Sequence, residues 1–233
     1  MPHPDLTDTT VVFDLDGTLV DTAPDLTNAL NDVLVRRGHE PVSGETIRSA
    51  VGMGARIMIK TALAKAGATG EIEPMLAEFL AYYDANIAAE SRPFPGAVAS
   101  LEMLKGRGAT LAICTNKREY LARKLIAALG LDGFFQAIAG RDSFPVAKPH
   151  PGHLTKTIAA AGGALSRAIM VGDSEVDILA AKGARLPVVM VSFGYAPAPL
   201  DGVRPDAVID HFDELAPLLP GLLGRRGGSA PSP

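Results

Sequence analysis

The sequence predicts an α/β fold in which a doubly wound parallel sheet carries an inserted all-helical domain. A short apolar run at residues 11–13, rich in β-branched side chains, ends at two aspartates and a glycine, as a buried strand entering a loop does. Residues 24–90 contain no strand-like run and repeat apolar residues at helical spacing. From residue 96 onward, strand-like and helix-like segments alternate, which is typical of a parallel sheet with right-handed crossovers.

These changes of pattern give the expected domain boundaries. Residues 1–21 and 91–220 are predicted to form the core, and residues 22–90 a helical insert of three or four helices. A hinge is expected at each junction; the second, at 91–96, contains two prolines and a glycine that stop any helix. Residues 221–233 are interpreted as having no core-forming content, so we expect a disordered tail there.

The core elements after the insert follow from apolar runs for strands and amphipathic spacing for helices, and glycines follow several of the helices. In chain order the expected elements are a helix over 98–107, a strand over 109–114, a helix over 117–129, a strand over 135–139, a helix over 152–161, a strand over 168–171, a helix over 177–183, a strand over 187–191 and an edge strand over 207–209.

Composition limits the function classes. Of the 233 residues, 47% are hydrophobic, and the net charge of −4 without a dense basic stripe argues against a nucleic-acid binder. No apolar stretch is long enough to span a membrane. The single cysteine, Cys114, excludes an internal disulfide and fits a reducing compartment, so a cytoplasmic protein with an inert core thiol is expected. The histidines lack metal-ligand spacing and are expected at the surface: His39, His150, His153 and His211.

Candidate functional residues begin at the end of the first strand, with Asp14 and Asp16. In an open α/β sheet, ligands bind at the carboxyl ends of the strands. Two carboxylates at that position repel each other, so a metal, a shared proton or a cationic substrate complex must hold them. A plain Asp-Gly turn after the strand is the simpler alternative.

Polar residues follow other expected strands in the same way. Thr115 and Asn116 come after 109–114 and offer a hydroxyl and an amide to phosphoryl oxygens. Lys148 lies on a proline-rich, stiff segment suited to aiming one charge. Asp173 follows 168–171, and Asp177 lies one helical turn further on, so both carboxylates can face the same side. Taken singly, these residues could be turn residues, a surface lysine and a helix cap.

One loop of the insert is also a candidate. Gly52 and Gly54 flank Met53 and permit close backbone approach, and Arg56 follows on an expected helix. This loop is either a helix–helix turn with solvated cations or a lid loop that touches a substrate.

Together, Asp14-x-Asp16-Gly-Thr, Thr115-Asn116, Lys148-Pro149 and the Asp173 to Asp177 segment resemble the four motifs of the haloacid dehalogenase superfamily. The resemblance spans residues 10 to about 210, and the helical insert matches that superfamily's C1 cap. Further segments resemble the phosphoglycolate phosphatase branch, namely the Val51-Gly52-Met53-Gly54 loop and residues 142–145, 172–177, 192–195 and 205–210.

The resemblance implies a role for each motif. Asp14 would be the nucleophile that forms an aspartyl-phosphate, and Asp16 the general acid and then the base. Mg²⁺ would be bound by the carboxylates of Asp14 and Asp173 and by the main-chain carbonyl of Asp16.

The remaining residues would act on the phosphoryl group or support the metal ligands. Thr115, Asn116 and Lys148 would bind the phosphoryl oxygens and stabilise their charge. Asp177 would orient its neighbours rather than bind the ion directly.

The resemblance also implies a reaction and a substrate class. Halide leaves without a proton, whereas an alkoxide needs an acid such as Asp16, so a phosphatase or mutase is favoured over a dehalogenase. The expected substrate is a small phosphorylated metabolite, 2-phosphoglycolate, handled by a monomer or homodimer. Another small-molecule phosphatase, a pyrophosphatase, a β-phosphoglucomutase-like mutase and a non-catalytic protein on this fold are the alternatives. Arg56, Arg48 and Lys60 are equal candidates for binding the substrate's carboxylate.

Overall fold

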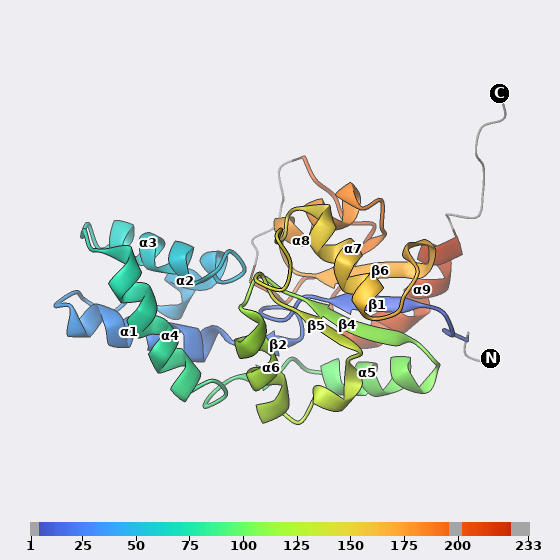
Figure 1. Ribbon diagram of the computed structural model, residues 1–233, viewed down its shortest axis with the longest axis horizontal. Helices are drawn as coiled ribbons and strands as arrows, with labels where there is room; N and C mark the ends of the chain where they lie inside the picture. The colour runs from blue at the N-terminus through green and yellow to red at the C-terminus, as the bar shows by residue number, and fades with distance from the viewer. Residues whose placement is uncertain (1–4, 196–201, 225–233) are drawn as a thin grey trace.

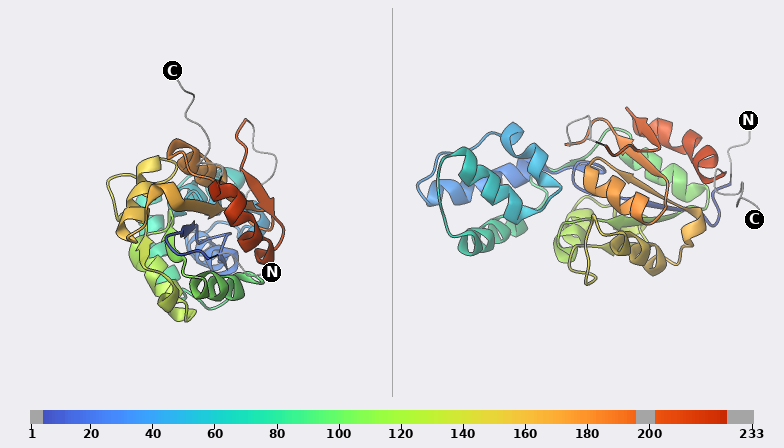
Figure 2. Two further views of the ribbon diagram at one scale, coloured as in Figure 1. Left: turned by 90° about the vertical axis from the view of Figure 1, so that its right-hand side faces the viewer. Right: turned by 90° about the horizontal axis from the view of Figure 1, so that it is seen from above.

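The computed structural model describes residues 5–195 and 202–224. It consists of a core built on a sheet and a group of helices, α1 to α4, that lies at one end of the core (Figures 1 and 2). We refer to α1–α4 as the cap. Most of the expected tail, residues 225–233, lies outside the described residues.

Within the described residues, the core contains one parallel six-stranded sheet in the order β5-β4-β1-β6-β7-β8. Its strands are β1 (Thr10–Phe13), β4 (Thr110–Cys114), β5 (Ala137–Ala139), β6 (Ala168–Gly172), β7 (Val188–Val191) and β8 (Ala207–Ile209). The strand order reverses at β1, which pairs with β4 on one side and β6 on the other. Such a switch point opens a crevice at the carboxyl ends of the strands. The predicted fold class is confirmed.

Helices cover both faces of this sheet (Figure 1): α5 (Ala97–Gly106), α6 (Glu119–Ala128), α7 (Pro151–Ala160), α8 (Glu175–Gly183) and α9 (Leu215–Gly224). The pleat of β1 sends Val11 and Phe13 into the apolar cluster shared with α5, α6 and α9. Val12 points into the cluster shared with α7 and α8. Because both faces are covered, β1 is a continuous apolar run.

Helix α9 extends beyond the expected start of the disordered tail. Leu222 and Leu223 are buried in the same cluster as Leu219. Their apolar side chains therefore belong to the core, and the expectation of disorder was wrong for residues 221–224.

The cap helices are α1 (Ala23–Arg36), α2 (Gly44–Val51), α3 (Ala55–Lys65) and α4 (Ile72–Ala85). Two short antiparallel strands, β2 (Val20–Asp21) and β3 (Arg92–Pro93), pair where the chain enters and leaves the cap. Asp25 stabilises this junction, because its carboxylate accepts hydrogen bonds from the Ser91 amide at 2.8 Å and the Ser91 hydroxyl at 2.6 Å. The sequence indicated two hinges here but not that they pair.

No helix in the described ranges is both long enough and apolar enough to cross a membrane.

Candidate active site

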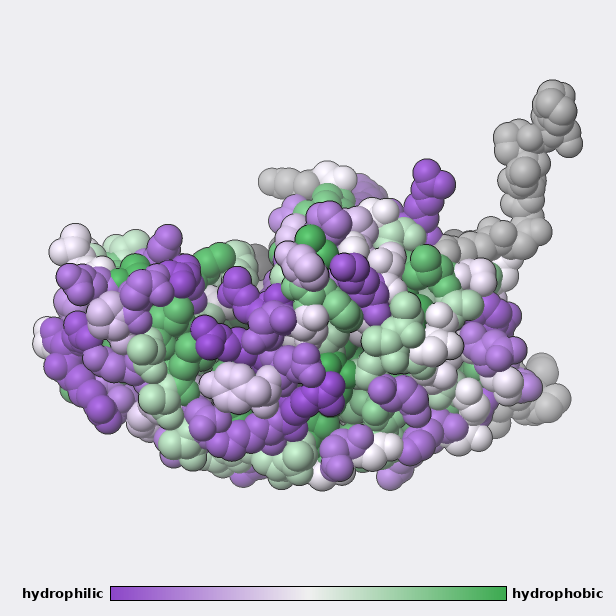
Figure 3. All heavy atoms as spheres, in the orientation of Figure 1, coloured by the Kyte–Doolittle hydropathy of each residue, from purple (hydrophilic) through white to green (hydrophobic). Residues whose placement is uncertain are grey.

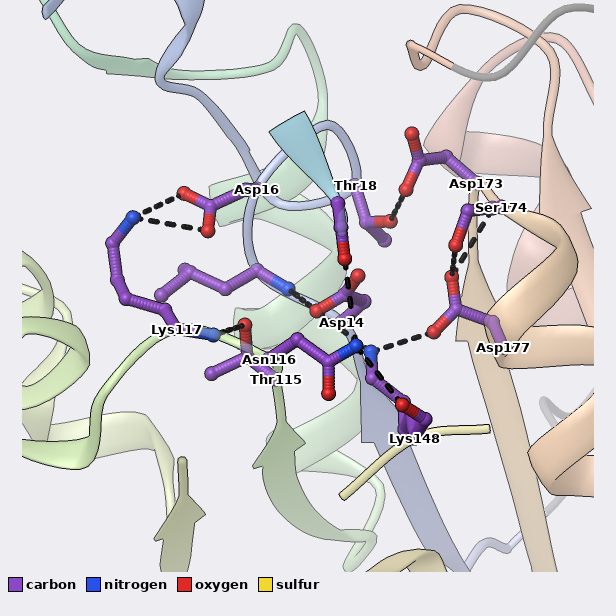
Figure 4. A network of polar contacts seen from close by, with 12 residues as sticks. Asp14, Asp16, Thr18, Thr115, Asn116, Lys117, Lys148, Asp173, Ser174 and Asp177 are labelled. Carbon is purple, nitrogen blue, oxygen red and sulfur yellow. Dashed lines mark hydrogen bonds and ion pairs between the residues drawn. The ribbon is translucent and has the colours of Figure 1, made fainter. Parts of the chain in front are cut away.

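The candidate residues meet at the carboxyl ends of neighbouring strands (Figure 4). Asp14 follows β1, Thr115 follows β4 and Asp173 follows β6, so the strand order brings them side by side. Lys148 enters from the loop before α7, and Asp177 from the first turn of α8. All five side chains are buried.

Lys148 lies between two of the aspartates. Its Nζ is 2.9 Å from Oδ1 of Asp14 and 2.6 Å from Oδ1 of Asp177. The other oxygen of Asp177 accepts hydrogen bonds from the amide and hydroxyl of Ser174, at 3.1 and 2.6 Å. Asp177 thus caps α8 and positions the lysine at the same time.

Asp173 is held from the opposite side. Its Oδ1 accepts a hydrogen bond from the Thr18 hydroxyl at 3.1 Å, and its Oδ2 accepts one from the Tyr195 amide at 2.8 Å. The backbone approaches this carboxylate closely, because a Cβ on Gly194 would lie 2.2 Å from the Asp173 Cβ and one on Gly17 would lie 2.5 Å from Oδ2. A larger residue at either position would force this carboxylate to move.

Burial governs the protonation of this cluster. It raises the pKa of Asp14 to about 8, with Lys148 opposing and the neighbouring carboxylates adding to the rise. It likewise raises the pKa of Asp173 to about 6, and Asp177 adds to the effect. Burial alone would lower the pKa of Lys148, but the carboxylates of Asp14 and Asp177 outweigh it and raise that pKa.

The cluster fits a divalent cation. Ligand oxygens of Asp14, Asp173 and Asp177 all lie within 4.8 Å of one another. Three buried carboxylates face one ammonium, so the cluster has an excess of negative charge and offers the oxygen ligands that a hard cation prefers. Asp177 pairs with the Lys148 ammonium and caps α8, whereas among the described residues Asp173 accepts hydrogen bonds from neutral donors only, so Asp173 is better suited than Asp177 to bind the ion beside Asp14.

Asp16 lies outside this cluster. Its two carboxylate oxygens are 2.7 and 3.0 Å from Nζ of Lys117, and Oδ1 also accepts a hydrogen bond from the Thr22 hydroxyl at 2.7 Å. Lys117 was not singled out from the sequence, which predicted only that a helix begins there. The available signal was its position directly after Thr115-Asn116, at a strand end.

Thr115 and Asn116 organise the same loop. The Thr115 hydroxyl accepts a hydrogen bond from the Lys117 amide at 3.2 Å. The side-chain amide nitrogen of Asn116 donates to the carbonyl of Lys148 at 3.1 Å and to that of Gly52 at 3.4 Å. Oδ1 of Asn116 is buried without a partner within the described ranges. Asn116 therefore joins the core to the cap loop, a contact that the sequence did not suggest.

A cavity of about 430 Å³ separates cap and core. The core side is mainly polar and includes Asp14 and Asp16, whereas the cap side is mainly apolar: Leu26, Val51, Met58, Leu76, Phe79, Leu80 and Tyr83. On the face shown in Figure 3, hydrophilic residues gather along the junction of the two parts.

The cap loop contributes only in part. Gly52, Gly54 and Arg56 line the cavity, but Met53 does not and is 50% exposed. The Arg56 guanidinium is paired with the Glu73 carboxylate.

The other expected cap cations lie elsewhere. The Arg48 guanidinium lies 5.1 Å from the centre of the Tyr195 ring, and Lys60 is exposed and does not line the cavity. Two core arginines that the sequence analysis did not single out, Arg118 and Arg141, do line it. Within the described part of the chain, neither forms an ion pair.

One histidine does not lie at the surface as predicted. His153 is fully buried rather than at the surface, because its ring supports the lysine loop. Nδ1 accepts a hydrogen bond from the Lys148 amide at 3.2 Å, and Nε2 lies 3.0 Å from the Gly140 carbonyl oxygen. Cys114 is buried as expected, and burial raises the pKa of its thiol to about 12, so it stays protonated.

Comparisons with known proteins agree with this arrangement. Residues 11–191 match the model of the haloacid dehalogenase-like hydrolases. A phosphoglycolate phosphatase of Agrobacterium fabrum is 45% identical over 222 residues, covering 94% of this chain and 95% of that protein. One of Mesorhizobium japonicum is 47% identical over 221 residues, covering 94% and 97% respectively.

Among solved structures, that of a predicted phosphoglycolate phosphatase from Haemophilus somnus 129PT superimposes with a TM-score of 0.84 at 30% identity, covering 91% of this chain and 98% of that one. The shared sheet, the matched segment and these identities over nearly the whole length lead to one conclusion. The chain belongs to the haloacid dehalogenase-like hydrolase family.

Proposed function

We propose that this chain is a Mg²⁺-dependent phosphomonoester hydrolase that converts 2-phosphoglycolate to glycolate and phosphate through an aspartyl-phosphate. One observation supports it most strongly. Asp14 and Asp16 follow the same strand and line the same cavity, yet Asp14 belongs to the buried cluster with Lys148 while Asp16 is held by Lys117. Two carboxylates in different environments suit two different roles.

In the first step, a carboxylate oxygen of Asp14 attacks phosphorus and the bond from phosphorus to the leaving oxygen breaks. The leaving oxygen takes a proton from Asp16. In the second step, Asp16 takes a proton from water while the water oxygen attacks phosphorus. The bond from phosphorus to Asp14 then breaks, which releases phosphate and restores the carboxylate.

The surrounding residues support these steps. Lys148 and the buried Thr115 hydroxyl offer positive charge and a polar contact beside Asp14, where the transferring group would lie. Bound Mg²⁺ would add positive charge that favours ionised Asp14 and offsets its repulsion of the phosphate dianion. Asp14 and Asp173 would bind the ion, and Asp177 would position Lys148.

Two observations support 2-phosphoglycolate as the substrate: the names of the matched relatives and the positive charges that line the cavity. The matched relatives are phosphoglycolate phosphatases. A small phosphate dianion that also carries a carboxylate would find Arg118 and Arg141 on the core side of the cavity, and neither arginine forms an ion pair among the described residues. Arg56, by contrast, already has Glu73 as its partner. Closure of the cap over the core would exclude bulk water from the reaction.

The test is phosphate release from a panel of small phosphomonoesters and pyrophosphate after EDTA treatment, with and without added Mg²⁺. We expect activity only with Mg²⁺ and the highest kcat/KM for 2-phosphoglycolate. A flat profile would contradict the substrate, and a sugar-phosphate product in place of phosphate would indicate a mutase. Asp14→Asn should abolish turnover, whereas Asp132→Asn, an exposed control, should not.

A cytoplasmic location and a monomer or homodimer remain predictions from the sequence. Size-exclusion chromatography with light scattering measures the second directly.

A further inference from the structure

We infer that Lys117 is the residue that positions Asp16 for proton transfer, and that Tyr83 of the cap fixes Lys117 in turn. The inference rests on the proposed function, because it concerns the carboxylate to which that function assigns the proton. It adds a residue outside the motifs found in the sequence and gives the cap a part in the chemistry.

The ion pair between Lys117 and Asp16 is almost completely shielded from water. The side chains are 5% and 8% exposed, and both Asp16 oxygens are within 3.0 Å of Nζ. No other lysine or arginine forms an ion pair with Asp16 in the described ranges. A buried carboxylate needs such a partner, and here the partner also fixes where the carboxylate points.

The backbone of Lys117 is itself fixed. Its amide donates to the Thr115 hydroxyl at 3.2 Å, and its carbonyl accepts a hydrogen bond from the Arg141 amide at 2.9 Å. The lysine side chain therefore starts from a rigid point next to the phosphoryl-binding strand end and reaches across the cavity floor to Asp16 (Figure 4).

Tyr83 places an aromatic face against the same ammonium. Nζ of Lys117 lies 4.7 Å from the centre of the Tyr83 ring, within the range of a cation–π contact. The ring is buried in α4 and stacks on Phe79 at 6.1 Å. The ammonium thus lies between a carboxylate of the core and a ring of the cap, and it is held on both sides only while the cap is in place.

The leaving group determines how much proton transfer from Asp16 accelerates the reaction. An alkoxide such as that of glycolate leaves poorly without a proton, whereas nitrophenolate is stable as the anion and needs little help. Loss of the positioning lysine should therefore slow the first step, formation of the aspartyl-phosphate, far more with an alkyl phosphate than with an aryl phosphate. The second step, in which Asp16 acts as the base, is common to both substrates and limits kcat alone, so kcat/KM is the quantity to compare. General structural damage would slow both substrates alike.

The experiment measures kcat/KM for 2-phosphoglycolate and for p-nitrophenyl phosphate in Mg²⁺. In Lys117→Met, we expect kcat/KM for 2-phosphoglycolate to fall on the order of 100-fold, and kcat/KM for p-nitrophenyl phosphate by less than about threefold. Lys117→Arg should restore part of the difference. Tyr83→Leu should shift the ratio of the two rates in the same direction by a smaller factor.

Lys124→Met is the matched control. Lys124 also joins core to cap, with Nζ 2.9 Å from the Asp84 carboxylate, but it does not contact Asp16. This variant should leave the ratio unchanged. If Lys117→Met does not fold, the ratios in Lys117→Arg and Tyr83→Leu decide the question.

Asp16→Asn separates this inference from the proposed function. If Asp16→Asn lowers kcat/KM selectively for the alkyl phosphate and Lys117→Met lowers it equally for both substrates, the positioning role is wrong and the proposed function stands. If Asp16→Asn also lowers kcat/KM equally for both, the role of Asp16 as proton donor to the leaving group is wrong, and the inference is overturned with it.

Discussion

The amide of Tyr195 donates a hydrogen bond to Oδ2 of Asp173 at 2.8 Å. The hydroxyl of the same tyrosine donates to Oδ1 of Asp21 at 2.5 Å and accepts from the amides of Thr22 at 2.7 Å and Ala23 at 2.9 Å. A single residue therefore joins a carboxylate of the acidic cluster to the junction where the chain enters the cap.

Tyr195→Phe tests this connection. The hydroxyl is the partner of two buried backbone amides, so its removal should lower the free energy of unfolding by about 2 kcal/mol. Urea unfolding followed by circular dichroism measures the difference. Tyr120→Phe, on a side chain that is 48% exposed, is the control and should change little. Equal stability of the two variants would show that the hydroxyl does not stabilise the junction.

Lys148→Met should destabilise the metal-free protein strongly. It leaves Asp14 and Asp177 buried without their shared cation, and breaking such a pair costs about 3 kcal/mol or more. Because Mg²⁺ would then supply the missing positive charge, we expect the ion to raise Tm more in the variant than in the parent protein. Thermal unfolding with EDTA and with Mg²⁺ measures both effects.

The control for this variant is Lys182→Met. Lys182 pairs with Asp206 at the surface, where an ion pair contributes less than about 1 kcal/mol. Two outcomes would contradict the assignment of a cation-binding cluster. One is a similar loss of stability in both variants, and the other is a Tm of Lys148→Met that does not change when Mg²⁺ is added.

The sequence predicted those parts of the fold and site that depend on local pattern. The strand at 11–13 was recognisable because both faces of β1 are buried, and the strand ends located Asp14, Thr115 and Asp173 because parallel strands share one carboxyl edge. The helical insert followed from its spacing. None of these inferences required knowledge of contacts between distant residues.

What the sequence missed depends on such contacts. Lys117 and Tyr83 lie in different parts of the chain, and only the packing of cap on core brings the ammonium to the ring. His153 has no neighbouring signal that would distinguish a ring supporting the Lys148 loop from a surface histidine. Leu222 lies in a glycine-rich terminal segment, and its burial follows from the docking of α9.

Because His153 is buried as the neutral form, the free energy of unfolding should fall in mild acid. Burial lowers its pKa to about 4 from an ordinary value of 6.5, with Lys148 adding to the effect. The unfolded chain therefore binds the proton first as the pH falls, so the contribution is present above pH 6.5 and is lost between about 6.5 and 4. We expect a loss of about 3 kcal/mol over that range.

The measurement compares urea unfolding of the parent protein and His153→Gln from pH 7 to pH 4. The variant should lose less stability over the range than the parent, since the other titrating groups are common to both. His39→Gln, a histidine without such burial, should follow the parent. A parent and His153→Gln that lose stability equally would show that His153 does not titrate as its burial predicts.

Gly194→Ala should displace Asp173 without unfolding the core. A Cβ at this position would lie 2.2 Å from the Asp173 Cβ and 2.7 Å from the Gly17 carbonyl oxygen, so the carboxylate must move. Displacing a carboxylate that is proposed to bind the ion should weaken Mg²⁺ binding by at least about tenfold, which titration calorimetry measures. Gly133→Ala, where an added Cβ meets nothing within 4 Å, is the matched control. Unchanged Mg²⁺ affinity in Gly194→Ala, with a folded protein by circular dichroism, would mean that the ion does not bind at Asp173.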